Sequence, residues 1–167
     1  MTTVEPAEAG VSIRRATRAD LLDVFRIEQA VFEQPWPYSA FEQQVGTPGF
    51  LVAEDAHTVE SPPPVSGYIV ADDIPNHGRP LGHVKDLAVR PERRGEGVGA
   101  ALLRRGLSAL ASQGARSVKL EVRESNEPAR GLYEKFGFEY LRTLPKYYAD
   151  GEDAYVLVAS LEDRDGF

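Results

Sequence analysis

Hydrophobic residues recur at helical spacing in two long stretches of the chain. Residues 19–32 place apolar side chains at positions i, i+3 and i+4, and only Glu28 interrupts that stripe. The same spacing runs through residues 98–113, where Gly114 supplies a C-terminal stop. Both stretches therefore predict helices that bury one face.

Two shorter helices are predicted from capping residues. Ser39 is suited to cap a helix over residues 39–45, which follows the proline-interrupted end of the first helix. Asn126 or Ser125 is suited to cap a further helix that ends at Gly137.

Seven apolar or alternating stretches predict strands, over residues 11–15, 50–53, 65–71, 81–89, 117–123, 138–148 and 154–160. Prolines 62–64 separate the second and third stretches and predict a stiff hairpin loop. The elements follow the order strand, two helices, three strands, helix, strand, helix, two strands. This order predicts an α/β fold in three layers, with a mixed central sheet.

Length and composition indicate one folded domain. The chain has 167 residues, of which 42% are hydrophobic and 27% charged. We expect a single domain over residues 11–161, a flexible tail over 1–10 and a short tail over 162–167. No apolar run is long enough to span a bilayer, and the start of the chain does not resemble a signal peptide. A cytoplasmic protein without a membrane partner is predicted.

The residue counts also exclude several classes of chemistry. The absence of cysteine excludes thiol nucleophiles, disulfides and cysteine-bound metals, and the three histidines stand singly, so no metal site is expected. A net charge of −7 argues against direct nucleic-acid binding. Residues 90–105 reverse that sign locally, with five arginines against two glutamates, which favours an anionic ligand there.

The segment Arg94–Gly99 contains three closely spaced glycines between a predicted strand and the long predicted helix. Glycine lets backbone N–H groups converge, and a helix N-terminus favours negative charge, so this turn suits a phosphate. The segment lacks the Gly-Lys-Ser/Thr of nucleotide hydrolases and the spacing of dinucleotide-binding loops. A glycine-rich connector without a ligand is the alternative.

Arg94-x-x-Gly97-x-Gly99 resembles the Gln/Arg-x-x-Gly-x-Gly/Ala motif of the GNAT superfamily of N-acetyltransferases. The predicted element order is similar to the GNAT fold, a mixed central sheet of about seven strands flanked by about four helices. Residues 120–126, 132–138 and 146–148, together with the Pro-Trp pair at 35–36, resemble the RimI-type enzymes that acetylate protein N-termini. The resemblance covers essentially the whole chain.

The resemblance implies acetyl-CoA as co-substrate, without a metal. It places the pyrophosphate on the backbone amides of Arg94, Gly95, Glu96, Gly97, Val98, Gly99 and Ala100. It pairs the pantetheine arm with Leu87, Ala88 and Val89, and it has the Val89 N–H polarise the thioester. It also assigns Asn126 to the pantetheine arm, although helix capping explains that residue equally well.

Glu121 is the expected general base and Tyr133 the expected general acid, both by resemblance. Period-two geometry turns Glu121 away from the apolar face of its strand, and burial that raises its pKa would suit the role. The alternatives are an ion pair of Glu121 with Lys119 or Arg123, and a core aromatic role for Tyr133. His83 is left out of the catalytic set, because a single strand histidine is usually structural.

The acceptor is expected to contact Trp36, Tyr38, Tyr147 and Tyr148, which lie in loops that bracket the peptide in RimI-like enzymes. Packing of these aromatic residues against helices and the sheet edge is the alternative. The expected function is N-terminal protein acetylation, with a protein or peptide N-terminus as partner, including a ribosomal protein. Acetylation of small amines or lysine, and a non-catalytic acyl-CoA-binding regulatory module, are the competing functions.

Overall fold

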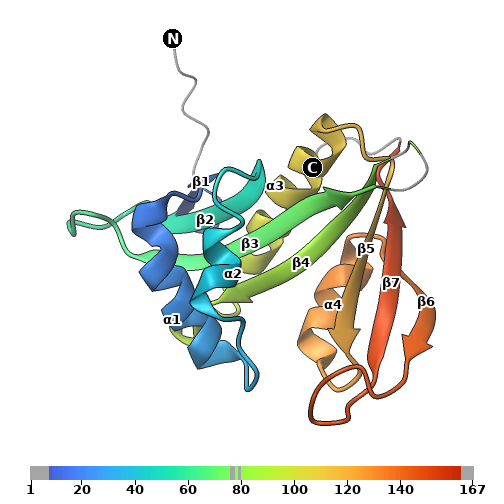
Figure 1. Ribbon diagram of the computed structural model, residues 1–167. Coiled ribbons are helices and arrows are strands. Elements are labelled where there is room, and N and C mark those ends of the chain that lie inside the picture. The colour runs from blue at the N-terminus through green and yellow to red at the C-terminus, as the bar shows by residue number, and fades with distance from the viewer. Residues whose placement is uncertain (1–7, 76–77, 79, 163–167) are drawn as a thin grey trace. The chain divides into compact units, whose positions relative to one another are not determined.

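The computed structural model describes residues 8–75, 78 and 80–162 (Figure 1). Within these residues the strands are β1 Val11–Arg15, β2 Gly49–Asp55, β3 Val65–Ile74, β4 Leu81–Val89, β5 Ser117–Arg123, β6 Glu139–Leu144 and β7 Ala154–Ser160. The helices are α1 Leu21–Val31, α2 Tyr38–Glu42, α3 Val98–Ser112 and α4 Glu127–Lys135, with short 3-10 turns η1 Arg18–Asp20 and η2 Pro91–Arg93.

All seven strands belong to one sheet in the order β1-β2-β3-β4-β5-β7-β6. β4 and β5 pair in parallel, with Gly82 opposite Val118 and Val84 opposite Leu120, whereas β1 pairs antiparallel with β2 and β7 pairs antiparallel with both β5 and β6. The predicted mixed sheet of seven strands with four helices is confirmed.

The chain divides into two compact units. Unit 1 comprises Met1–Val70 and Asp86–Gly106, and unit 2 comprises Ala71–Lys85 and Leu107–Phe167. The chain passes from one unit to the other within β3, β4 and α3, so neither unit is a continuous stretch of sequence. The single domain expected over residues 11–161 stays a prediction.

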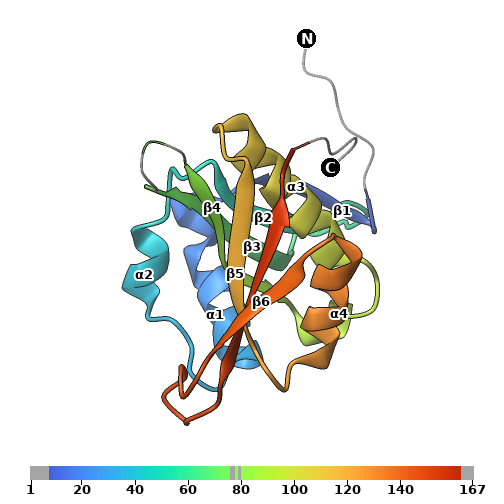
Figure 2. The same cartoon turned by 90° about the vertical axis from the view of Figure 1, so that its right-hand side faces the viewer.

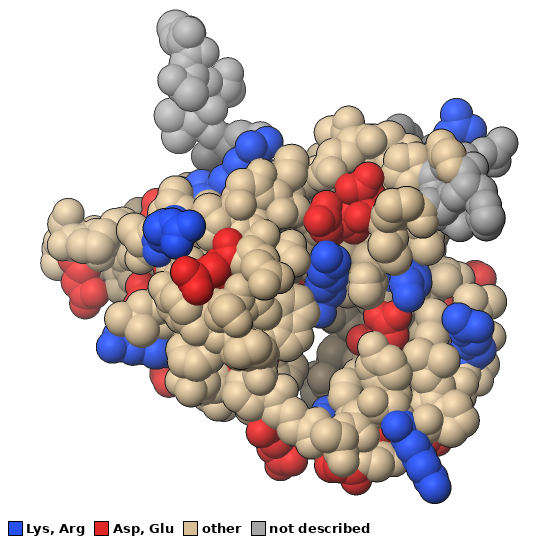
Figure 3. All heavy atoms as spheres, in the orientation of Figure 1, with Lys and Arg blue, Asp and Glu red and all other residues tan. Residues whose placement is uncertain are grey.

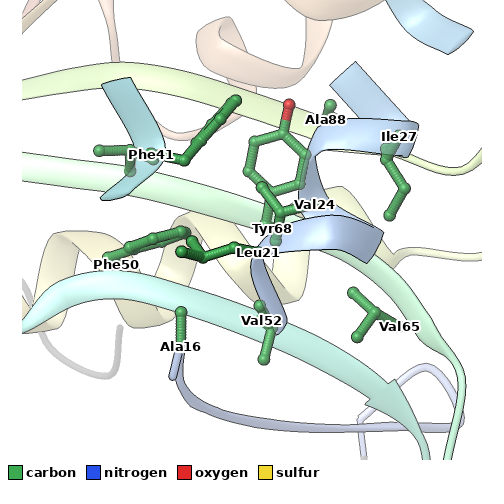
Figure 4. Close-up of a cluster of buried hydrophobic side chains, with 11 residues drawn as sticks. Ala16, Leu21, Val24, Ile27, Phe41, Phe50, Val52, Val65, Tyr68 and Ala88 are labelled. Carbon is green, nitrogen blue, oxygen red and sulfur yellow. The ribbon is translucent and has the colours of Figure 1, made fainter. Parts of the chain in front are cut away.

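Unit 1 has a core of apolar side chains between its strands and α1 and α2, which cover one face while α3 lies on the other (Figures 1 and 2). Figure 4 shows this core, in which Phe41 of α2 packs against Phe50 of β2 and Tyr68 of β3. The ring centroids lie 6.3 and 5.6 Å from that of Phe41. Glu28 is the polar exception on the buried face of α1, with 1% of its surface exposed.

Unit 2 follows the predicted alternation along β5. Val118, Leu120 and Val122 are buried, while the residues between them are partly exposed. Figure 2 shows α4 beside β5, β7 and β6. The Asn126 Oδ1 atom accepts a hydrogen bond from the Ala129 N–H at 3.3 Å, which confirms Asn126 as the cap of α4.

Several predicted boundaries are wrong. The helix predicted over residues 39–45 runs over Tyr38–Glu42, and the strand predicted over residues 65–71 continues to Ile74. α2 is capped by Pro37 rather than Ser39, because extended Pro37 makes Tyr38 the first helical residue. β6 ends at Leu144 instead of continuing to residue 148. Proline follows at position 145 and has no N–H for the ladder, and Lys146 then adopts a left-handed φ of 50°.

Of the predicted tails, residues 1–7 and 163–167 lie outside the described residues. Next to the first of them, Glu8 forms an ion pair with Arg104, and the Gly10 carbonyl accepts a hydrogen bond from the Ala56 N–H at 2.9 Å.

Charges of both signs are mixed on the face shown in Figure 3, and neither sign gathers into an extended patch there. No helix in the described part of the chain is long and apolar enough to cross a bilayer. The cytoplasmic location stays a prediction.

Gly67 of β3 lies against the end of β4 in unit 1, and we predict that Gly67→Ala destabilises the fold. A Cβ atom there would lie 2.7 Å from the Ala88 carbonyl oxygen and 3.3 Å from the Val89 Cα, so the backbone would have to shift. Overpacking of this kind costs about 1–3 kcal/mol in the free energy of unfolding, which urea titration measures. Gly131→Ala is the control, because no heavy atom lies within 4 Å of its Cβ and alanine favours a helix. Equal stability of the two variants would contradict the prediction.

Candidate active site

The glycine-rich loop of unit 1 leads directly into α3. Gly95 and Gly97 have φ angles of 79° and 85°, in the left-handed region that glycine adopts without strain. The Ala101 N–H donates to the Gly97 carbonyl at 3.1 Å, so the N–H groups of residues 98–100 precede the first intrahelical hydrogen bond. Residues 94–97 are exposed. The loop can therefore receive an anion on its backbone amides.

Most arginines near this loop are engaged within unit 1. The Arg90 Nη2 atom donates to the Val65 carbonyl at 2.6 Å, and Arg93 forms ion pairs with Asp55 and Glu96. Arg94 is exposed. The arginines behind the local positive charge of residues 90–105 thus make contacts within unit 1 as well as lying near the loop.

The strand end Leu87–Val89 belongs to the same unit. Ala88 is buried, while Leu87 and Val89 are partly exposed. Gly67 of the neighbouring strand leaves space for the Ala88 carbonyl oxygen, which would lie 2.7 Å from a Cβ atom at that position. The sequence analysis missed Gly67, and a glycine inside a strand pattern is the signal that points to such an approach.

Glu121 lies in unit 2, on the polar face of β5 as predicted. Its Oε2 atom lies 2.7 Å from His83 Nε2, and its Oε1 atom accepts a hydrogen bond from Lys119 Nζ at 2.8 Å. Only 11% of the side chain is exposed. Of the two ion-pair partners considered from the sequence, Lys119 is present, whereas Arg123 instead contacts Asp150 and Glu152.

A pKa raised by burial would suit Glu121 as a base, but the pKa of Glu121 is lowered instead. Burial alone does raise that pKa, but the hydrogen bonds and charges of His83 and Lys119 outweigh it and hold the pKa at about 2. The carboxylate is therefore ionised over the whole physiological range, and on its own it is a weak base.

His83 is the functional candidate that the sequence analysis set aside. The parallel pairing of β4 with β5 places it beside Lys119, and its ring reaches Glu121. An Nε2–H that donates to the carboxylate leaves Nδ1 as the proton acceptor of the imidazole. The signal was available in part, because alternation along β4 puts His83 on its less buried face.

Tyr133 and Asn126 both have structural roles in α4. Tyr133 is 8% exposed, and its ring packs edge-on against Phe138 at a centroid distance of 5.7 Å. Asn126 uses its side-chain oxygen as the helix cap. The packing and capping interpretations therefore hold, and the catalytic and pantetheine roles stay predictions.

The turn between β6 and β7 carries the two predicted acceptor tyrosines of unit 2. The rings of Tyr147 and Tyr148 meet edge-on at 5.0 Å, and the Arg123 guanidinium lies 4.0 Å from the centre of the Tyr148 ring. Burial is the main cause that raises the pKa of Tyr148 to about 12, so its hydroxyl stays protonated. Tyr147 is half-exposed.

The remaining acceptor candidates, Trp36 and Tyr38, belong to unit 1. The Trp36 ring lies 5.3 Å from that of Phe41, and Tyr38 packs edge-on against Phe25 at 5.8 Å. Their packing interpretation holds, and contact with an acceptor stays a prediction.

The predicted site residues thus form two sets. Unit 1 contains the glycine-rich loop, Leu87–Val89, Trp36 and Tyr38, and unit 2 contains Glu121, Asn126, Tyr133, Tyr147 and Tyr148. In the described part of the chain, no three histidine or acidic side chains group together as metal ligands.

Comparison with known proteins gives a family and several relatives. The family model described as "Acetyltransferase (GNAT) family" matches residues 19–138. An N-alpha-acetyltransferase of Sulfolobus acidocaldarius is 37% identical over 155 residues, which cover 89% of this chain and 92% of the relative. A putative [ribosomal protein bS18]-alanine N-acetyltransferase of Bacillus subtilis is 31% identical, over 91% of this chain and 97% of the relative.

The structure is also similar to solved ones. The crystal structure of Ard1 from Thermoplasma volcanium superposes with a TM-score of 0.79 at 30% identity and covers 90% of this chain and 97% of Ard1. The match supports the arrangement of strands and helices predicted from the sequence.

The low pKa of Glu121 predicts acid-sensitive stability. Because the pKa falls from its ordinary value of 4.5 to about 2 on folding, the ionised carboxylate stabilises the protein fully above pH 4.5, and this contribution is lost as the pH falls toward 2. The contribution is on the order of 3 kcal/mol. Urea unfolding of wild type and Glu121→Gln between about pH 6 and pH 2.5 measures it. We expect the difference between their free energies of unfolding to shrink as the pH falls, and a constant difference would contradict the assigned pKa.

Proposed function

This chain belongs to the acetyltransferase (GNAT) family, and we propose that it transfers the acetyl group of acetyl-CoA to the α-amino group of a protein or peptide N-terminus. The family makes the chain an acyltransferase. Two relatives that align with nearly their whole length are named N-alpha-acetyltransferase and putative [ribosomal protein bS18]-alanine N-acetyltransferase. A ribosomal protein N-terminus is accordingly one acceptor class.

The glycine-rich loop is suited to the coenzyme. We assign the pyrophosphate to the backbone amides from Arg94 to Ala100, of which those of residues 98–100 precede the first intrahelical hydrogen bond, whereas the Arg94 N–H already donates to the Pro91 carbonyl at 3.4 Å. We assign Leu87–Val89 to the pantetheine arm, with the Val89 N–H at the thioester carbonyl. When bound, acetyl-CoA supplies a thioester whose carbonyl carbon bonds to the amine nitrogen while its carbon–sulfur bond breaks.

The observation that carries the acceptor assignment is the positive charge around Glu121. The Lys119 ammonium group already bonds to its carboxylate, and this charge disfavours a second cation such as the ammonium form of the acceptor. The acceptor must therefore react as a neutral amine. At pH 7 roughly one α-amino group in ten is neutral, against roughly four lysine amines in ten thousand. A site that accepts only the neutral amine thus favours an N-terminus over lysine.

Glu121 alone cannot accept the proton that the amine loses during the reaction. The nitrogen of the neutral amine has one proton too many once it bonds to the thioester carbonyl carbon, and a carboxylate whose pKa is about 2 is too weak a base to hold that proton at neutral pH. We assign the proton to the Glu121–His83 pair, in which Glu121 orients the imidazole through Nε2 and His83 accepts the proton, directly or through a water molecule.

We assign the remaining roles by the resemblance of this sequence to the family. We assign Tyr133 as the acid whose hydroxyl proton goes to the departing thiolate, because its packed ring would hold that hydroxyl in a fixed direction. Asn126 is assigned to the pantetheine arm, and Trp36, Tyr38, Tyr147 and Tyr148 are assigned to the acceptor peptide.

An acceptor panel tests the function. We expect coenzyme A release with short peptides that have a free N-terminus, including peptides that begin with alanine, and no release when the α-amine is blocked. Free lysine, polyamines and blocked peptides with internal lysine are the controls. Release with these controls alone would identify an acetyltransferase with another acceptor, and acetyl-CoA binding without any release would indicate a regulatory module.

Side-chain variants test the proton path. Glu121→Gln and His83→Gln should each lower kcat about 100-fold and leave acetyl-CoA affinity within about twofold. If Glu121 were the base alone, His83→Gln would raise the pKa of Glu121 and leave the rate unchanged or higher, which would contradict the paired role. Exposed Glu134→Gln is the matched control.

Tyr133→Phe should lower kcat with the fold retained, because the ring still packs against Phe138. Tyr140→Phe is its control, since that ring is 60% exposed. Equal rates for the two variants would remove the acid role of Tyr133.

A further inference from the structure

A buried carboxylate in α1 has no part in the proposed chemistry. Glu28 lies on the apolar face of the helix with 1% of its surface exposed. Burial of a carboxylate is costly unless hydrogen-bond donors compensate it. In the part of the chain that the structure describes, its partners are Trp36, Tyr68 and Asp86, and none of them is a basic side chain.

The first donor is the backbone of the segment between α1 and α2. The Trp36 N–H donates to Glu28 Oε2 at 2.7 Å. Pro35 and Pro37 flank Trp36, and proline has no N–H group. The Trp36 N–H is thus the sole backbone donor through which residues 35–37 can be held.

The second donor comes from the core of unit 1. The Tyr68 hydroxyl donates to Glu28 Oε1, and it also lies 3.3 Å from Asp86 Oδ2. The Tyr68 ring is fully buried and stands edge-on to Phe41 (Figure 4). Because that ring is fixed by packing, the direction of its hydroxyl is fixed as well.

The third partner is Asp86 of β4. Burial, followed by the hydrogen bond and the negative charge of Glu28, raises the pKa of Asp86 well above its usual range. Asp86 keeps some exposed surface as a residue, but its carboxyl group is withdrawn from water. A hydrogen bond between two carboxyl groups requires a proton between their oxygens, and the raised pKa of Asp86 favours Asp86 as its donor.

These contacts join two segments of unit 1 that the proposed function uses. Trp36 belongs to the segment assigned to the acceptor, and Asp86 directly precedes the strand end Leu87–Val89 assigned to the thioester. We infer that Glu28 is a positioning residue, which fixes the backbone of Trp36 for the acceptor and, through Tyr68 and Asp86, ties it to the strand that receives acetyl-CoA. The acceptor part of this inference rests on the proposed function.

The test uses Trp36 itself, which is the single tryptophan of the sequence. Glu28→Gln keeps the volume of the side chain but presents one acceptor oxygen to three donors. We expect a shift in tryptophan emission, a rise of about tenfold in the KM for a peptide acceptor, and acetyl-CoA affinity within about twofold of wild type. Exposed Glu33→Gln, three residues from Trp36, is the matched control and should change neither the emission nor the KM.

A pair of substitutions at Asp86 provides the second measurement. Asp86→Asn retains an N–H donor toward Glu28, as a neutral acid does, whereas Asp86→Ala removes the donor. We expect wild-type emission and KM for Asp86→Asn, and for Asp86→Ala the changes seen in Glu28→Gln. If Glu28→Gln does not fold, the comparison of Asp86→Asn with Asp86→Ala still tests the inference.

Three results would overturn the inference. Unchanged emission and peptide KM in Glu28→Gln would show a purely structural carboxylate, even if the variant unfolds more easily. Equal effects of Asp86→Asn and Asp86→Ala would remove the donor role of Asp86. Wild-type emission in all variants would show that Trp36 is held by other contacts. If the wild type acetylates no peptide, the proposed function fails, while the emission measurements still test the anchoring of Trp36.

Discussion

β4 is a central strand of the sheet, and the strands paired with it on both sides withdraw its middle residues from water. Two ionisable side chains there, His83 and Asp86, therefore need hydrogen-bond partners. His83 meets this constraint through Glu121, and Asp86 meets it through Glu28 and Tyr68. The first pairing belongs to unit 2 and carries the candidate proton path. The second belongs to unit 1 and carries the anchor of the Trp36 segment. Both follow from the need to compensate a polar group on a central strand.

Glu121 shows that burial by itself does not decide how a carboxyl group titrates. Its desolvation favours the neutral acid, but two hydrogen-bonding side chains within 3 Å, one of them the Lys119 ammonium group, favour the anion more strongly. Asp86 has the opposite environment, with a carboxylate and a phenol in place of cations, and its pKa is raised. The sign of the neighbouring charge therefore accounts for the difference between the two carboxyl groups. Glu121 has a cation beside it and stays an anion that can orient a base, whereas Asp86 has a carboxylate beside it and is favoured as a hydrogen-bond donor.

The anion-binding loop depends on backbone geometry more than on side-chain charge. Two left-handed glycines turn the chain into α3, whose first amides precede the first intrahelical hydrogen bond. Arg90 and Arg93 form hydrogen bonds within unit 1, although the five arginines of residues 90–105 suggested a cationic surface from the sequence. Backbone amides can bind an anion whatever side chains they carry, so the glycines are the residues of the loop that indicate this role in the sequence.

The sequence by itself determined what depends on local spacing. Apolar periods of two and 3.6 residues predicted the elements and their order, the glycine spacing predicted the loop, and alternation along β5 placed Glu121 on the polar face. Local turn chemistry was harder to predict, since Pro37 displaced Ser39 as the cap of α2 and the turn after Leu144 shortened β6.

Only the tertiary structure decided the partners of the polar groups. His83 and Glu121 are 38 residues apart in the chain, and Glu28 and Tyr68 are 40 apart. No periodicity reports which side chain lies across a strand pair or beneath a helix. The charge state of a buried group is the balance between its desolvation and those distant partners, so its direction became known only when the fold brought them together.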